Sequence, residues 1–188
     1  MLTTAAALRG ATKNYKTFTL GPIDLVVPAG SILGLIGENG AGKTTALKLL
    51  CGAIRPDGGS VELLGGSPAD PAVRARIGVV FEDAYFPDCF NAACVGKSMA
   101  GIFSARWDAA KFDAFLQRFG LDGSKKIKEY SRGMRMKLSL ATALAHDPEL
   151  LILDEATAGL DPVVRGELLD LLLDFIQDER HSVLMSSH

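Results

Sequence analysis

Residues 32–45 form the segment that most restricts how this chain can fold. The apolar run from Ile32 to Ile36 has the length of a buried strand, and it leads directly into GENGAGKT at residues 37–44. The next residues, KTTALKLLCG, have helical spacing and end at Gly52, a glycine that can stop a helix. A buried strand, a glycine-rich turn and a helix in this order predict an α/β fold with a mainly parallel sheet.

The glycine-rich turn matches the pattern G-x-x-x-x-G-K-[ST], whose residues suit a phosphate group. Glycines let backbone N–H groups turn inward around an anion, and the following helix directs its positive end to the same place. Lys43 adds a charge for the β- and γ-phosphates, and the Thr44 hydroxyl suits Mg²⁺. The alternative, a glycine-rich turn without a ligand, would match by chance less than roughly once in a hundred such chains. The expected nucleotide-binding residues here are Gly37, Asn39, Gly40, Ala41, Gly42, Lys43, Thr44 and Thr45.

A second polar group follows another apolar run. Asp154 and Glu155 come directly after the strand-like LLIL at residues 150–153. Parallel sheets bind ligands at the carboxyl ends of their strands, which is where this pair would lie. Asp154 is expected to hold Mg²⁺, and Glu155 to accept a proton from the water that attacks the γ-phosphate. Acidic residues after strands often only cap helices. It is the presence of the phosphate loop in the same chain that makes a catalytic role for this pair the better interpretation.

The composition is typical of a globular protein and argues against several other classes of protein. Of 188 residues, 48% are apolar and the formal net charge is −2, which fits one globular domain without a general attraction to nucleic acid. The sequence has no apolar run of about 18 residues, the length needed to cross a membrane as a helix. Its three cysteines, Cys51, Cys89 and Cys94, lack metal-ligand spacing, which predicts a reduced, cytoplasmic setting without disulfides or zinc.

The other expected elements follow from capping residues and apolar patterns. FTLGPIDLVVPAG is expected to form two short strands, with turns at Gly21–Pro22 and at residues 28–30. SVELLGG, IGVVF and HSVLMSSH are expected to be further strands. The predicted helices begin after the caps Asp70, Asp108, Ser131 and Asp161, and a helical region is expected over about residues 90–119.

With these motifs assembled, the chain resembles the ATP-binding subunit of ABC transporters over nearly its whole length. YSRGM at residues 130–134 resembles the signature usually written LSGGQ, and AGLD at 158–161 resembles the family's D-loop. Tyr15 lies where the family has an aromatic that stacks on adenine. His188 resembles the switch histidine that contacts the γ-phosphate.

The resemblance implies a P-loop NTPase: an α/β fold with a mainly parallel core sheet, an N-terminal antiparallel β subdomain and a helical subdomain. All 188 residues would form one domain. The nucleotide-binding core and β subdomain would take about residues 1–81 and 146–188, and the helical subdomain about 82–145. The family normally continues beyond the switch histidine, so a truncated C-terminal end is expected.

The resemblance also implies two composite sites in a homodimer that forms on ATP binding. Ser131 and Gly133 would act on ATP held by the partner chain, and Asp161 would align the two sites. Lys43, Glu155 and His188 would be the catalytic residues, and Thr44, Asp154 and Glu82 would hold Mg²⁺. Several positions depart from the family pattern. In the signature, Arg132 replaces the first glycine, and Tyr130 and Met134 replace the flanking Leu and Gln. Glu82 stands where a glutamine is usual, and Ala156 replaces the usual proline after the catalytic glutamate.

The implied function is ATP hydrolysis that powers a separate membrane permease, with bacterial exporters the subclass that these motifs resemble most. The permease would dock on about residues 86–119, and the subunit would lie in the cytoplasm at the inner face of the membrane. No nucleic-acid partner is expected. One alternative is a soluble ABC-type ATPase that works on ribosomes or DNA. Another is a module that binds ATP without turning it over, because His188 lies at a free end.

Overall fold

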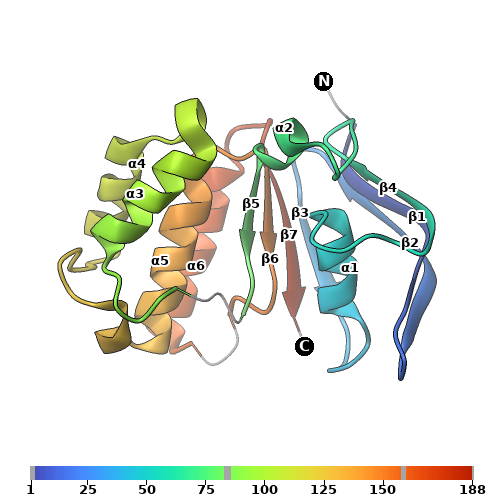
Figure 1. Cartoon of the computed structure of the whole chain (residues 1–188), viewed down its shortest axis with the longest axis horizontal. Helices are drawn as coiled ribbons and strands as arrows, with labels where there is room; N and C mark the ends of the chain where they lie inside the picture. The colour runs from blue at the N-terminus through green and yellow to red at the C-terminus, as the bar shows by residue number, and fades with distance from the viewer. Residues whose placement is uncertain (1–2, 83–85, 158–159, 188) are drawn as a thin grey trace.

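A parallel sheet stands at the centre of the molecule, as the sequence predicts (Figure 1). The computed structural model describes residues 3–82, 86–157 and 160–187. The sheet has the strand order β3-β7-β6-β5, and each neighbouring pair runs parallel. The phosphate loop follows one edge strand, and Asp154 follows an inner strand. The strand bounds are β3 Ile32–Ile36, β5 Ile77–Val80, β6 Leu150–Leu153 and β7 Ser182–Ser187.

An antiparallel sheet of order β2-β1-β4 lies beside the parallel one, with bounds β1 Thr4–Asn14, β2 Thr19–Pro28 and β4 Gly58–Leu63. The prediction of a turn at Gly21–Pro22 is wrong, because β2 continues through both residues. The pairing of β2 with β1 shifts register around Ala11. Gly21 has φ +89° and approaches the Ala11 carbonyl too closely for a Cβ, so this glycine serves an irregular strand pair.

The predicted helix starts are confirmed. Side chains of Asp70, Asp108, Ser131 and Asp161 each accept a hydrogen bond from a backbone N–H in the first turn of their helix. Asn91 caps a further helix in the same way. The helices are α1 Lys43–Leu50, α2 Pro71–Arg74, α3 Ala92–Phe103, α4 Ala109–Arg118, α5 Arg132–Leu144 and α6 Pro162–Phe175, with short 3₁₀ turns η1 Ser104–Arg106 and η2 Ile127–Glu129.

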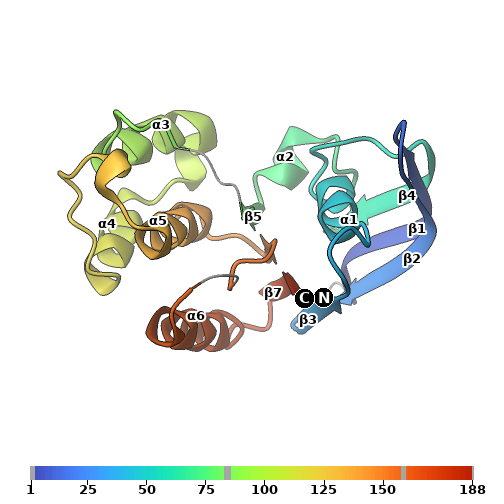
Figure 2. The ribbon, with the colours of Figure 1, turned by 90° about the horizontal axis from the view of Figure 1, so that it is seen from below.

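The two faces of the parallel sheet pack on different layers (Figure 2). Strand β6 shows the alternation, because its successive side chains point to opposite faces. Leu150 and Ile152 pack in a cluster with α1 and the antiparallel sheet, whereas Leu151 and Leu153 pack in a cluster with α3 to α6. All four side chains are fully buried, so this strand is held from both sides.

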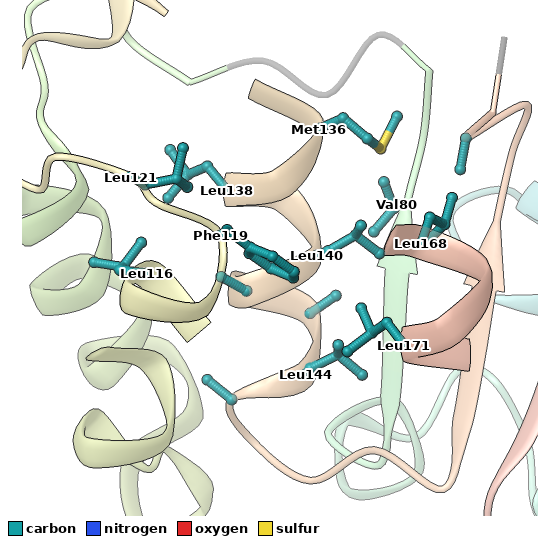
Figure 3. Packing of buried hydrophobic residues seen from close by; sticks show 14 of the residues in the cluster. Val80, Leu116, Phe119, Leu121, Met136, Leu138, Leu140, Leu144, Leu168 and Leu171 are labelled. Atoms are coloured by element: carbon teal, nitrogen blue, oxygen red, sulfur yellow. The ribbon is translucent and has the colours of Figure 1, made fainter. Parts of the chain in front are cut away.

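Helix α5 lies at the centre of the helical layer (Figure 3). Leu140 and Leu144 lie in one buried cluster with Leu168 and Leu171 of α6, and Val80 of β5 belongs to the same cluster. On its other side, Leu138 lies near Leu121. The start of α5 is therefore fixed relative to the core sheet by side chains packed along the rest of the helix.

His146, just beyond α5, is a buried structural residue. Its side chain is 2% exposed, its Nε2 lies 2.9 Å from the Ile77 carbonyl oxygen, and its ring stacks on Phe103. Burial lowers the pKa of His146 from the ordinary value of 6.5, because the charged imidazolium would lose its water.

This depressed pKa predicts a pH dependence of stability. Below about pH 6.5 the unfolded chain binds a proton that the folded chain does not, so the free energy of unfolding falls as pH drops. The stability that neutral His146 contributes is fully present above about pH 6.5. It is lost as the pH falls towards the pKa of His146 in the folded protein. We expect a His146→Phe variant to lose less stability than the wild type between about pH 7.5 and 5.5 in urea titrations. Equal losses in the two proteins would contradict the assignment.

Candidate functional site

The phosphate loop wraps around the ammonium group of Lys43. Lys43 Nζ donates hydrogen bonds to the carbonyl oxygens of Gly37 (2.7 Å) and Glu38 (3.1 Å), and it lies 3.4 Å from Glu155 Oε1. The side chain is 7% exposed. The charge is therefore held at the inside of the loop, directly beside the acidic group that follows β6.

Helix α1 begins without a side-chain cap. Its N-cap is Gly42, with φ +93°, whereas each of the other described α-helices has an Asp, Asn or Ser cap that accepts a backbone N–H. A Cβ at Gly42 would collide with Leu20 and crowd Phe18, so only glycine fits this turn. The positive end of α1 is thus open towards the loop, where an anion is favoured.

Asp154 and Glu155 are fixed by a residue that sequence reasoning missed, Ser186 on β7. The Ser186 hydroxyl donates to Asp154 Oδ1 (2.7 Å) and accepts from the Glu155 backbone N–H (2.9 Å). Ser186 is fully buried and Asp154 is 4% exposed. Glu155 has φ +49°, a conformation that costs a non-glycine residue about 1–3 kcal/mol and tends to occur at functional sites. The hydrogen bond from its N–H helps to hold that conformation.

A Ser186→Ala variant should show how much this hydroxyl contributes to stability and to turnover. It leaves a buried carboxylate oxygen without its donor, which costs about 1–3 kcal/mol of the free energy of unfolding. We expect a corresponding fall in the urea midpoint and a loss of the expected nucleotide turnover, because the Glu155 backbone loses the hydrogen bond that helps to hold it. Ser98→Ala is the matched control, since Ser98 is exposed on α3 and donates to the Cys94 carbonyl within its own helix. A Ser186→Ala variant as stable as this control would refute the role.

A cavity of about 700 Å³ joins these elements at the carboxyl ends of the strands, the lower edge of the sheet in Figure 1. Its volume lies in the range of ligand pockets. Eight of the predicted site residues line it: Asn39, Gly40, Gly42, Lys43, Thr44, Thr45, Glu82 and Glu155. Two unpredicted residues also line it, Phe18 and Arg132. The cavity therefore brings together the phosphate loop, the acidic group after β6 and the start of α5.

Tyr15 does not line this cavity. Its side chain is 46% exposed, and its backbone N–H donates to the Phe18 carbonyl in the turn between β1 and β2. Phe18, three residues later, is the aromatic that reaches the cavity and packs against Gly42. The turn between β1 and β2 therefore decides which aromatic ring lines the cavity.

The YSRGM segment forms the start of α5. Ser131 Oγ accepts from the Met134 backbone N–H (3.2 Å), as predicted for a cap. Tyr130 is 5% exposed, and its hydroxyl donates to the Asp122 carbonyl, which explains how tyrosine replaces an apolar residue here. Arg132 Nη2 lies 2.8 Å from Glu82 Oε1, so these two departures from the family pattern form an ion pair with each other.

The remaining predicted residues lie outside the cavity lining. Gly37 and Ala41 belong to the loop but are not among the lining residues, and Asp154 is buried. Ser131 and Gly133 lie beside Arg132, with Gly133 close to Val164 of α6. Asp161 caps α6 through the N–H groups of Val163 and Val164. His188 and the residues Ala158 and Gly159 of the D-loop resemblance lie outside the described residues.

Comparison with known proteins agrees with this geometry. A family model described as ABC transporter matches residues 20–158, which contain the phosphate loop, the start of α5 and the acidic pair after β6. The chain belongs to the ABC transporter family. The resemblance drawn from the motifs is thus confirmed, together with its P-loop α/β fold.

Curated relatives include ATP-binding proteins named for drug resistance and for export. A daunorubicin resistance ATP-binding protein of Streptomyces coeruleorubidus is 39% identical over 181 residues, covering 90% of this chain and 56% of that protein. The Nod factor export ATP-binding protein I of Cupriavidus pinatubonensis is 36% identical, covering 100% of this chain and 59% of that protein. This ABC chain spans little more than half the length of the curated relatives it matches.

Solved structures share the ABC fold. A dimeric ATP-binding cassette bound to ADP and phosphate superposes with a TM-score of 0.86 at 21% identity, covering 97% of this chain and 88% of that one. A protein from Clostridium perfringens that is part of an ABC transporter complex has a TM-score of 0.78 at 24% identity, covering 100% of this chain and 79% of that one. In the described part of the chain, no helix has the length and apolar character needed to cross a membrane.

Proposed function

We propose that this chain is the ATP-binding and ATP-hydrolysing part of an ABC transporter, and that it powers a separate membrane permease. The observation that carries the proposal is the cavity that joins Lys43 and Thr44 of the phosphate loop to Glu155 after β6. Phosphoryl transfer to water needs these parts together: a cradle for the phosphates, charge to stabilise the transition state, and a group that orients water.

Mg²⁺ fits the donors present. The structure shows no cluster of three or more His, Cys, Asp or Glu side chains within residues 3–82, 86–157 and 160–187. Magnesium does not need one, because it keeps several waters and uses one or two carboxylates together with substrate phosphates. The Thr44 hydroxyl, Asp154 and Glu82 would hold it, and it would neutralise charge on the phosphates. The hydrogen bond from Ser186 already orients the Asp154 carboxylate.

Each side chain of the site has its own role in the proposed hydrolysis of ATP. Lys43 leaves Glu155 and the loop carbonyls to bind the β- and γ-phosphates. Glu155, freed from that ion pair and held through its backbone N–H, orients water and accepts its proton. His188 would steady the γ-phosphate. Phe18, which lines the cavity, supplies an apolar surface beside the loop, and Tyr15 remains a proposed adenine contact.

A second copy of the chain would complete each site. Ser131, Gly133 and Asp161 lie outside the cavity lining of their own chain, which is consistent with action on nucleotide held by a partner. In this proposal residues of about 1–81 and 146–188 form the nucleotide-binding core, and about 82–145 form the helical subdomain that carries the signature segment.

The permease would dock on the helical region from about residue 86 to 119, at the inner face of the membrane. An apolar groove of about 430 Å³ borders this region, where Phe86, Met99 and Phe103 line it together with residues of the core and α5. Ile102, the neighbour of Phe103 in α3, is 69% exposed. The names of the relatives, which include export of Nod factor and resistance to daunorubicin, support an exporter. Nucleic acid is not an expected partner.

Purification of the full-length protein with its native membranes would test the partner. We expect an integral membrane protein to copurify, and an Ile102→Glu variant to lose it. Leu173→Glu is the matched control, because Leu173 is 53% exposed on α6, away from α3. Copurification of nucleic acid instead, or equal loss with both variants, would overturn the permease assignment.

A further inference from the structure

Two ion pairs neutralise the lining of the nucleotide cavity. Its charged side chains are Lys43, Glu82, Arg132 and Glu155. Lys43 Nζ lies 3.4 Å from Glu155 Oε1, and Arg132 Nη2 lies 2.8 Å from Glu82 Oε1. Each cation therefore has a carboxylate beside it in the structure without nucleotide. A triphosphate needs those cations, so it must compete with both carboxylates.

The Glu82–Arg132 pair also connects two layers of the fold. Glu82 follows the core strand β5, whereas Arg132 is the first residue of α5 in the helical layer. One turn further along α5, Arg135 pairs with Asp88 at 3.3 Å. Asp88 and Arg135 do not line the cavity, so only the first of these two pairs can respond to a ligand there.

The Glu82 carboxylate cannot keep its ion pair with Arg132 and also bind Mg²⁺ with the same oxygen atoms. Its carboxylate is committed to Arg132 here, yet it stands among the residues proposed to hold Mg²⁺. Both side chains are well exposed, at 42% and 55%, and such pairs are weak in water. A divalent ion and a phosphate oxygen are stronger partners for the carboxylate and the guanidinium respectively.

We propose that the Glu82–Arg132 ion pair is an occupancy switch of the nucleotide cavity. Glu82 leaves Arg132 when a magnesium nucleotide is bound, and the Arg132 guanidinium then binds a phosphate oxygen. This inference rests on the proposed ATP-binding function and adds to it a second phosphate-binding cation, whose availability depends on Mg²⁺. The phosphate belongs to the nucleotide in the same chain or to that of a second copy.

Binding of a non-hydrolysable ATP analogue, measured by calorimetry with Mg²⁺ and with EDTA, tests the switch without any turnover. With Mg²⁺, Arg132→Ala should bind roughly 10-fold more weakly than the wild type, whereas with EDTA the difference should stay under about 2-fold. Glu82→Gln should bind roughly 3- to 10-fold more tightly than the wild type in EDTA, because Arg132 is free. The double variant should lose that gain.

Arg135→Ala is the matched control, since it removes an arginine of the same helix whose ion pair lies outside the cavity. It should bind like the wild type under both conditions, and Arg132→Lys should recover part of the loss. Equal effects of Arg132→Ala with and without Mg²⁺, or a Glu82→Gln gain that survives in the double variant, would overturn the switch. If the wild type itself fails to bind, the proposed function fails instead.

Light scattering at the same protein concentrations identifies the source of the phosphate. An Arg132→Ala effect that persists where the protein is monomeric assigns the contact to nucleotide in the same chain. An effect that occurs only where dimers form assigns it to the nucleotide of the second copy. Circular dichroism melting curves of each variant confirm that the binding changes come from folded protein.

Discussion

Replacing Lys43 with alanine should abolish tight ATP binding. A hydrogen bond to a charged group is worth about 1.5–3 kcal/mol, and the ammonium group has donors for both the β- and γ-phosphates. We therefore expect the dissociation constant for ATP to rise roughly 100-fold or more. In the structure this side chain is already buried inside the loop, so the variant removes a charge that no neighbouring cation of the loop replaces.

The control for this measurement is Lys97→Ala, because Lys97 is an exposed lysine of α3 away from the cavity. It should bind ATP like the wild type. Isothermal titration of both variants with ATP and Mg²⁺ gives the comparison directly. Unchanged affinity in Lys43→Ala would refute the assignment of the phosphate loop, and with it the proposed function.

Replacing Glu155 with glutamine should stop turnover while ATP binding persists. General base catalysis contributes typically about 10²- to 10⁴-fold, so hydrolysis should fall by about that factor. Glutamine has nearly the same shape, but it cannot accept the proton from water. The backbone N–H that bonds Ser186 is retained, so the local conformation should survive. ATP would then accumulate on the protein in the Mg²⁺-bound state.

Light scattering of Glu155→Gln with and without Mg-ATP measures whether the accumulated ATP makes the protein dimerise. We expect dimers only with Mg-ATP, because signature residues of one chain would close over nucleotide held by the other. The control is Glu62→Gln, because Glu62 is half-buried and pairs with Arg9 on the antiparallel sheet; this variant should hydrolyse ATP at the wild-type rate. Residual turnover in Glu155→Gln equal to the wild type would remove Glu155 from the catalytic role.

Much of the site could be predicted from the sequence because its residues are consecutive. The loop from Gly37 to Thr45 and the pair Asp154–Glu155 each lie in a short segment whose apolar strand precedes it directly. Helix caps such as Ser131 and Asp161 are equally local, since each side chain bonds an N–H two or three residues later. Local hydrogen bonding of this kind is encoded within a few residues.

Pairing between distant strands decided the parts that sequence reasoning missed. Leu153 of β6 stands beside Met185 of β7, and this register places Ser186 next to Asp154. No pattern in the segment that contains Ser186 predicts that contact, because serine is common at strand ends. Likewise, the register shift between β1 and β2 at Ala11 turns Gly21 from an expected turn residue into part of a strand.

The sequence by itself determined the parallel α/β fold, the phosphate loop, the acidic pair and the starts of the helices, because those features depend on neighbours along the chain. Only the tertiary structure decided that Phe18 rather than Tyr15 faces the cavity and that Ser186 holds the acidic pair. It also decided that Arg132 meets Glu82 across 50 residues. Such contacts depend on strand register and on the packing of α5 against the sheet, which are set by the whole buried core.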